Sequence, residues 1–331
     1  MEPFVFVVLI VFLGLAFDYT NGFHDAANVV STVIATRVLA PATAIVLAGV
    51  LNVIGATQIS GVAKTIATGI VQSSSASSPA ILTALMGAII WNVLTWHFGL
   101  PSSSSYALIG GLIGASWVSS GMDSILWSGV VYKVAIPMVA SPFIGYCIAF
   151  TFMKIAVLIR GKRKRSEKVF RHLQIGSACI VALSHGLNDA QKSMGIITLG
   201  LFTTGFLTNQ TVPYWVIFSC AIVMGLGTAS GGMRIIRTLG FSITKLRPIQ
   251  GFAAEASASC VILSASFLGM PISSTHMIVG SVTGVGYATD GKKAIHWDVI
   301  QKLCIAWIVT LPGAAVVSAL FYKLSSFFIH V

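Results

Sequence analysis

Apolar residues fill this chain in stretches of membrane-spanning character, separated by short polar segments. A helix needs about 20 apolar residues to cross a hydrocarbon core of about 30 Å. The stretches nearest that length are Phe4 to Phe17, Ala40 to Ile59, Ile125 to Ile159 and Val299 to Ile329. Other apolar segments are shorter and end at Gly or Pro, which favours broken helices and re-entrant hairpins. The pattern predicts an all-α polytopic membrane protein with about 10–12 helical membrane segments.

Composition and charge agree with a membrane protein. Hydrophobic residues make up 56% of 331 positions, charged residues 9%, and the net charge is +11. The basic residues cluster in loops instead of covering a solvated face with aromatic residues between them, so no nucleic-acid partner is expected. Their densest run lies at 161–168, continued by Arg171. The positive-inside rule places this run in the cytoplasm, and the alternative is a patch for anionic lipid or nucleic acid.

The two halves of the chain repeat one another. The segment from Gly22 to Asn28 matches the segment from Gly186 to Lys192 at an offset of 189 − 25 = 164. Further along, the offset is 274 − 104 = 170, because about six extra residues lie between Gly200 and Gly225. The matches at the second offset include Ser60 with Ser230, Gly99 with Gly269, Gly110 with Gly280, Gly114 with Gly284, and Trp127 with Trp297. We predict one repeat at 1–160, a basic cytoplasmic loop at 161–171 and a second repeat at 172–331.

The repeats are predicted to have inverted topology. Residues 1–3 and 329–331 carry no Lys or Arg, which favours both termini outside when the central loop is inside. Each repeat then crosses the membrane an odd number of times, as in many secondary transporters. The partial helices are expected after Asp25 and around Pro101.

Two acids at corresponding positions, Asp25 and Asp189, are the first candidates for chemistry. Ionisable groups inside a bilayer are costly and usually mark an ion or substrate path. Asn28 and Lys192 each follow an acid by three residues and share its helical face. A structural ion pair between Asp189 and Lys192 is the alternative. His24 has three possible roles: proton shuttle, hydrogen-bond donor to substrate, or buried polar group with its own partner.

Two clusters of hydroxyl residues, at 103–105 and 273–275, form the second candidate. Each follows a Gly and a Pro that end one apolar segment and precedes a second apolar segment. A helix N-terminus there offers free N–H groups to an anion near the membrane midplane. The alternative is that the hydroxyls cap the helices or allow close packing. Glu255, whose counterpart is Leu85, is expected to line a cavity or to hydrogen-bond between helices.

Charge counting links the two candidates. A doubly charged oxyanion beside Asp25, Asp189 and Lys192 gives a net charge of −3, which a site of low dielectric constant cannot hold alone. Two or more monovalent cations are therefore expected to bind with the anion, and their gradient is expected to drive uptake.

These motifs resemble the inorganic phosphate transporter (PiT) family. The resemblance rests on the segment from Gly22 to Asn28, the segment 36–41, the segment from His185 to Lys192 and the paired Pro-x-Ser-Ser-[Ser/Thr] hairpins. It covers nearly the whole chain and implies a cation-coupled phosphate symporter with two inverted repeats. His24 stands where the family signature has Asn, as in bacterial members, some of which are coupled to H⁺. Na⁺ is favoured, with H⁺ coupling or another oxyanion such as sulfate or arsenate as alternatives.

The resemblance also assigns site residues. It implies that the two acids are essential and that both hydroxyl clusters contact phosphate or its cations. The predicted phosphate ligands are Ser104, Ser105, Ser274, Thr275, Asn28, Asn188 and Lys192. The predicted cation ligands are Asp25, Asp189, Ser103, Ser273 and His24, with Asp25 and Asp189 as the Na⁺ ligands.

Other classes of function fit the sequence less well. An intramembrane hydrolase would need a serine activated by His185 or His24, but the chain has no G-x-S-x-G elbow. No cofactor is expected besides the transported cation. A multi-pass protein of the plasma or inner membrane is predicted, with lipid, phosphate and Na⁺ as partners. By analogy with transporters whose mobile hairpins need a rigid scaffold, a homodimer is expected.

Overall fold

The computed structural model describes residues 3–160 and 166–328, and these are helical almost throughout. The first half contains α1 Pro3–Ala35, α2 Pro41–Ala56, α3 Gly61–Gly69, α4 Ser78–His97, α5 Ser104–Ser120, η1 Met122–Ser124, α6 Trp127–Val130, η2 Val131–Ala135 and α7 Ile136–Arg160. The second contains α8 Ser166–Thr203, α9 Tyr214–Ser230, α10 Met233–Phe241, α11 Pro248–Phe267, α12 Ser274–Asp290, η3 Lys292–Ala294 and α13 Trp297–Phe328. The all-α prediction is confirmed.

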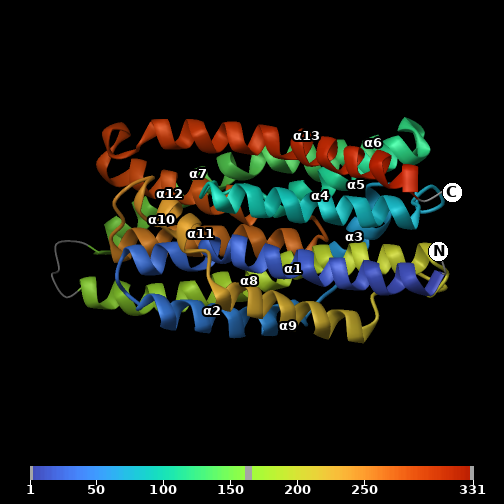
Figure 1. The fold of residues 1–331 in the computed structure, drawn as a ribbon. Helices are drawn as coiled ribbons and strands as arrows, with labels where there is room; N and C mark the ends of the chain where they lie inside the picture. Colours follow the sequence, from blue (N-terminus) through green and yellow to red (C-terminus); the bar gives the residue numbers. More distant parts are fainter. Residues whose placement is uncertain (1–2, 161–165, 329–331) are drawn as a thin grey trace.

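The second half repeats the order of the first and runs in the opposite direction. Figure 1 shows α1 starting at the end of the bundle where both termini lie, whereas α8 starts at the opposite end. In the same way α2, α3, α4 and α5 correspond to α9, α10, α11 and α12, and α7 corresponds to the long α13. The connection at 204–213 is longer than its counterpart at 36–40, which accounts for the change of offset. The inverted repeats are confirmed.

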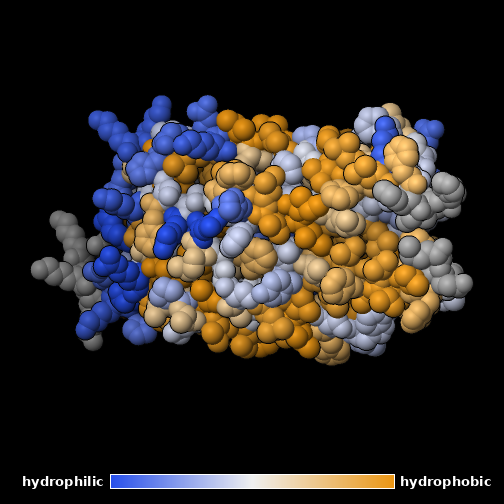
Figure 2. Space-filling model, viewed as in Figure 1, coloured by the Kyte–Doolittle hydropathy of each residue, from blue (hydrophilic) through white to orange (hydrophobic). Residues whose placement is uncertain are grey.

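The surface of the bundle suits a lipid bilayer. Four helices are long and apolar enough to span a membrane, or up to six spans exist if each of two bent helix pairs counts as one. Figure 2 shows apolar residues over much of the visible face and hydrophilic residues gathered at the end opposite the termini. Many large apolar side chains are exposed, among them Phe143 and Ile308. The chain is a multi-pass membrane protein.

The positions of the helix breaks differ in part from those expected. α1 continues unbroken through Asp25, and α8 through Asp189. These segments contain Gly but no Pro, and their polar side chains find partners on neighbouring helices, so nothing interrupts the backbone hydrogen bonds. The sharp bends lie instead between α2 and α3, at 71°, and between α9 and α10, at 70°.

The start of α8 overlaps the predicted basic loop. α8 begins at Ser166, so the stretch from Ser166 to Arg171, at the end of that loop, is helical. Glu167 lies in the first turn of α8, where its negative charge stabilises the helix by interacting with the positive end of the helix dipole. Residues 161–165, which hold most of the basic run, lie outside the described residues.

The break around Pro101 is confirmed, and it recurs at Pro271. α4 and α5 form one hairpin, and α11 and α12 form the other, each with a glycine of positive φ at the turn: +65° at Gly99 and +67° at Gly269. Only a glycine adopts this conformation without strain. The two turns meet inside the bundle, where the hydroxyl of Thr275 donates to the carbonyl of Ser102 over 3.2 Å.

Glycines let helices of the two repeats pack backbone to backbone. A Cβ on Gly110 or Gly114 of α5 would overlap carbonyl oxygens of α13. A Cβ on Gly280 or Gly284 of α12 would overlap carbonyl oxygens of α7. The last helix of each repeat therefore holds the hairpin of the other through close helix contacts at these glycines.

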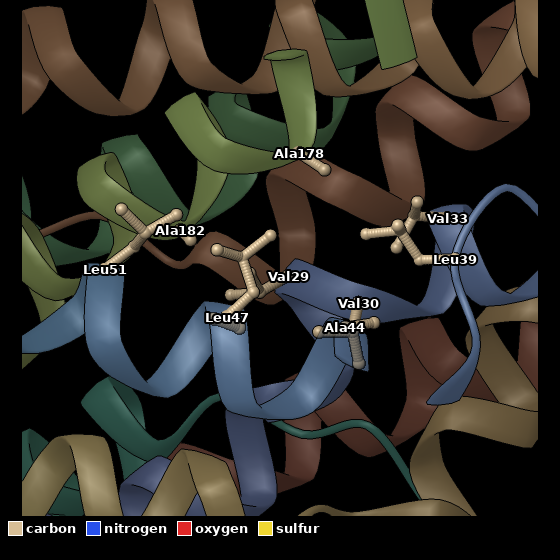
Figure 3. A pocket seen from close by; sticks show the side chains of 10 residues that line it. Val29, Val30, Val33, Leu39, Ala44, Leu47, Leu51, Ala178 and Ala182 are labelled. Carbon is tan, nitrogen blue, oxygen red and sulfur yellow. The ribbon is translucent and has the colours of Figure 1, made fainter. Parts of the chain in front are cut away.

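The packing between α1, α2 and α8 is apolar and dense. Figure 3 shows valines of α1, leucines of α2 and alanines of α8 directed toward one another. The cavity left between them is about 10 Å³, barely the size that one water occupies. The side chains that line it are all apolar, so this region is part of the packed core that supports the site.

We expect Gly114→Ala and Gly284→Ala to lower the thermal unfolding midpoint of the detergent-solubilised protein. Overpacking of this kind costs about 1–3 kcal/mol, because the added methyl group must push apart two helix backbones. Gly176→Ala in α8 is the matched control, since nothing lies within 4 Å of its added Cβ. Equal midpoints for all three variants would contradict the close packing.

Candidate functional site

The two predicted acids meet in the interior of the bundle. Asp25 on α1 is 2% exposed and Asp189 on α8 is 0% exposed. Ligand atoms of Asp25, Asp189 and His185 all lie within 4.8 Å of one another. One acid from each repeat therefore contributes to a single buried cluster, which we call the central site.

Asp25 is paired with the residue before it. His24 Nδ1 lies 2.8 Å from Asp25 Oδ1, and His24 Nε2 lies 3.1 Å from the hydroxyl of Thr95 on α4. Ser102, in the first hairpin turn, donates to the same threonine hydroxyl over 2.9 Å. His24 thus links the acid of the first repeat to the turn of the first hairpin.

Asp189 has more partners than Asp25. Lys192 Nζ donates to its Oδ1 over 2.5 Å, and the hydroxyl of Ser274 donates to its Oδ2 over 3.0 Å. His185 Nε2 lies 3.1 Å from the same Oδ2, one helical turn earlier on α8. The ion pair with Lys192 that the spacing allowed is present.

The first turn of α12 is held against both acids. Asn28 donates from its amide to the hydroxyls of Ser274, over 3.2 Å, and Thr275, over 2.9 Å. Lys192 Nζ also donates to the carbonyl of Ile272 over 3.3 Å. A residue of α1 and a residue of α8 therefore both contact the second hairpin, as a site shared by the two repeats requires.

The first turn of α5 offers hydroxyls that are not engaged. The side-chain oxygens of Ser103 and Ser104 are buried and have no hydrogen-bond partner among the described residues. Ser105 is buried beside them. Because an unpartnered buried hydroxyl costs free energy, the two free serines suit a ligand that the hairpins enclose.

Two predicted ligands make structural hydrogen bonds within the protein. Ser273 accepts a hydrogen bond from the backbone N–H of His276 over 3.3 Å and so caps α12. Asn188 donates to Ser266 over 2.8 Å and thereby ties α8 to α11. Asn188 Oδ1 remains unpartnered in the described part of the chain, so only this atom is available to a ligand.

Sequence reasoning missed several members of the cluster. His185 was considered only as the base of a hydrolase, although it lies one helical turn before Asp189 on the same face. Thr95 and Ser102 carried no signal, because their role depends on how the first hairpin packs against α1. Glu255 is fully buried and hydrogen-bonds with Thr32 of α1, as expected for a group that joins helices.

The central site carries a negative charge without a ligand. With both histidines neutral, the two carboxylates and Lys192 sum to −1. Carboxylate, hydroxyl and amide oxygens are the ligands that hard cations prefer, whereas Lys192, the amide of Asn28 and the hydroxyls supply donors for an anion. The arrangement can hold an anion and cations side by side.

A large cavity lies elsewhere. It has a volume of about 460 Å³ between α7, α12 and α13, and its lining is almost entirely apolar. Val139, Phe143 and Ile308, which line it, are more than half exposed. In a membrane these side chains face lipid, so the cavity is a lateral groove and not the polar site.

Comparison with known proteins gives consistent matches. A sequence profile described as "Phosphate transporter family" matches residues 21–164 and again residues 157–318. A "Probable low-affinity inorganic phosphate transporter" of Rhizobium meliloti is 43% identical over 96% of each chain. A protein of the same description from Bacillus subtilis is 41% identical over 96% of each chain.

A solved structure has the same fold. "The sodium-dependent phosphate transporter" aligns with a TM-score of 0.89 over 98% of this chain and all of that chain, at 24% identity. At this identity the match establishes the arrangement of the helices and not the roles of individual residues.

Proposed function

Because this chain belongs to the phosphate transporter family, we propose that it is a secondary active symporter that imports inorganic phosphate together with a cation, most favourably Na⁺. The family consists of transporters and not enzymes, so the intramembrane hydrolase is set aside. The solved structure with the same fold is named a sodium-dependent phosphate transporter, which supports Na⁺ as the coupling ion of this chain.

The meeting of Asp25 and Asp189 is the observation that carries the proposal. The two acids come from different repeats, are buried, and lie within 4.8 Å through their ligand atoms. Adding doubly charged phosphate to a site of charge −1 gives −3, and such a charge is unstable away from water. Two or more bound cations compensate it, which couples phosphate movement to the cation gradient.

The proposed ligands form two groups, one that binds phosphate and one that binds the cations. Phosphate is held by the hydroxyls at the N-termini of α5 and α12, from Ser104, Ser105, Ser274 and Thr275, and by Asn28 and Lys192. Asn188 contributes its free Oδ1, which accepts from the hydroxyl that a doubly charged phosphate retains. The cations are held by Asp25 and Asp189 with His24, Ser103 and Ser273. The positive ends of both helix dipoles favour the anion at the hairpin tips.

Proton coupling is the second candidate, and two contacts favour it. His24 is hydrogen-bonded to Asp25 at 2.8 Å, and His185 lies 3.1 Å from Asp189. Each acid therefore has its own imidazole, and imidazole is the side chain that exchanges protons most readily near neutral pH.

The distribution of charge supports an orientation in the membrane. Basic residues gather where α8 begins and just beyond the ends of α1, α10 and α12, namely Arg37, Lys168, Arg171, Lys245, Arg247, Lys292 and Lys293. Figure 1 shows α8 beginning at the end of the bundle opposite the termini. By the positive-inside rule this end is cytoplasmic and both termini are outside. Alternating access then moves the central site, or the gates beside it, between the two faces, in a protein that we propose to be a homodimer.

An imposed Na⁺ gradient should accelerate uptake of radiolabelled phosphate into proteoliposomes. The reason is that the cations neutralise the site as phosphate enters it. A pH gradient applied separately tests the second candidate, and excess unlabelled sulfate or arsenate tests the choice of anion. If neither gradient accelerates uptake, coupled transport is wrong.

Asp25→Asn and Asp189→Asn should each reduce cation-driven phosphate uptake by at least about tenfold, equivalent to about 1.4 kcal/mol. Each change removes one negative charge that a cation must neutralise. Asp123→Asn, which changes an exposed acid of η1, is the control and should transport normally. Surface expression and elution as a single species show that the variants fold; full activity in a folded variant would remove that carboxylate from the mechanism.

Cysteine labelling should reveal the orientation. Met122 in η1 and Lys292 in η3 are exposed and occupy corresponding positions, since 292 − 122 = 170. In intact cells a membrane-impermeant maleimide should label Met122→Cys but reach Lys292→Cys only after permeabilisation. The unmodified chain reports the background of its five cysteines. The opposite labelling pattern would invert the proposed topology.

A further inference from the structure

A third acid lies on α1, two turns before the central site. Asp18 is 0% exposed, and the mechanism proposed above does not use it. Its Oδ1 accepts a hydrogen bond from the hydroxyl of Ser193 on α8 over 2.7 Å. Its Oδ2 is buried and has no hydrogen-bond partner among the described residues. Half of this carboxyl group is therefore unsatisfied.

Asp18 shares the helical face of Asp25. The two are separated by 25 − 18 = 7 residues, which is two turns or about 10 Å along the helix. Asn21 lies between them on the same face, is 0% exposed, and also has an unpartnered Oδ1 in the described part of the chain. Acceptor oxygens thus follow one another along α1 toward the central site.

No described cation neutralises Asp18. The ion pairs of the described residues involve Asp25, Asp189 and Asp290. Around Asp18, α8 presents Ser193 together with the more distant charges of Asp189 and Lys192, and α9 presents the thiol of Cys220, a weak donor to the carboxyl group. A carboxylate in a membrane interior whose neighbouring donors are only a hydroxyl and a thiol is costly, and a proton or a metal ion would complete this group.

Glu255 provides the contrast. It is equally buried, but Thr32 and Gln174 donate to its Oε1 over 2.6 and 3.1 Å, and Ser177 donates to its Oε2 over 2.5 Å. Both of its oxygens are satisfied by the protein alone. Of these two additional buried acids, Asp18 is the one with an unpartnered oxygen.

We propose that Asp18, with Ser193 and Asn21, forms a second binding site for a small monovalent cation, Na⁺ or H⁺, between the central site and the end of the bundle where both termini lie. We call it the outer cation site. Its location rests on the orientation and the cation coupling proposed above, since on that basis it lies on the path of cations that enter from outside. A cation bound there occupies the unpartnered oxygens of Asp18 and Asn21 and lies within about two helical turns of Asp25.

If the outer cation site exists, a change at Asp18 should alter the Na⁺ dependence of phosphate uptake without abolishing uptake at saturating Na⁺. In Asp18→Asn we expect the Na⁺ concentration for half-maximal phosphate uptake to rise by about tenfold and the Hill coefficient for Na⁺ to fall. Uptake at saturating Na⁺ should persist, because Asp25 and Asp189 remain. A parallel titration of pH at fixed Na⁺ concentration shows whether the cation is H⁺ instead. In that case the pH dependence of uptake differs between Asp18→Asn and the unmodified protein, and the Na⁺ dependence is the same in both.

Matched variants separate this effect from general damage. Asp18→Glu keeps the carboxyl group and should restore cation dependence, and Ser193→Ala should shift it in the direction of Asp18→Asn. Thr198→Val is the control for the serine, since Thr198 is equally buried on α8 but bonds to the carbonyl of Met194 in its own helix. Asp123→Asn is the control for charge.

Direct binding keeps the test independent of transport. Purified Asp18→Asn should bind one Na⁺ fewer than the unmodified protein in equilibrium dialysis with ²²Na⁺, or release one proton fewer if the site binds H⁺. If uptake by the unmodified protein is independent of both gradients, the coupling proposal fails while dialysis still tests the site. Unchanged stoichiometry and unchanged cation titrations in a folded Asp18→Asn protein would overturn the outer cation site.

Discussion

The structure depends on the cost of placing carboxylates where water is absent. Asp25 and Asp189 are buried in helices of a membrane protein, so each must be surrounded by groups that compensate its charge. The chain meets this requirement by crossing α1 and α8 at the acids and directing both hairpin turns to the crossing. The contacts of Lys192, Ser274, Asn28 and His24 then act as one network, and a ligand that enters must replace some of them.

The hairpins can serve such a site because each is held by the other repeat. Gly110 and Gly114 bring α5 against α13, while Gly280 and Gly284 bring α12 against α7. Backbone contact of this kind holds the hairpins by close van der Waals packing. Because each repeat supports the other's hairpin, the proposed alternating access would involve both repeats together, as in other transporters built from inverted repeats.

Much of this architecture was predictable because short segments of the sequence determine it. Gly99 and Pro101, like Gly269 and Pro271, favour a helix end where they stand close together, and the collinear matches at two offsets identify the repeats. The continuity of α1 through Asp25 and the membership of Thr95 and Ser102 in the central site were not predictable. They depend on partners distant in sequence, and a polar residue in an apolar segment gives no indication of whether the helix breaks or a neighbouring helix supplies a hydrogen bond.

The approximate symmetry of the fold does not extend to the chemistry of the site. Asp25 and Asp189 correspond, but His24 corresponds to Asn188 and Asn28 to Lys192. Asp25 is therefore paired with an imidazole alone, whereas Asp189 has both the imidazole of His185 and the ammonium group of Lys192. Asp18 corresponds to Ala182, which places the extra acid on one side of the centre only. In the proposed mechanism the symmetric fold opens the site to both faces in turn, whereas the asymmetric acids make the two approaches to the site chemically different. On the proposed orientation, the approach from outside is the one that attracts cations first, before they reach the acids that phosphate requires to be neutralised.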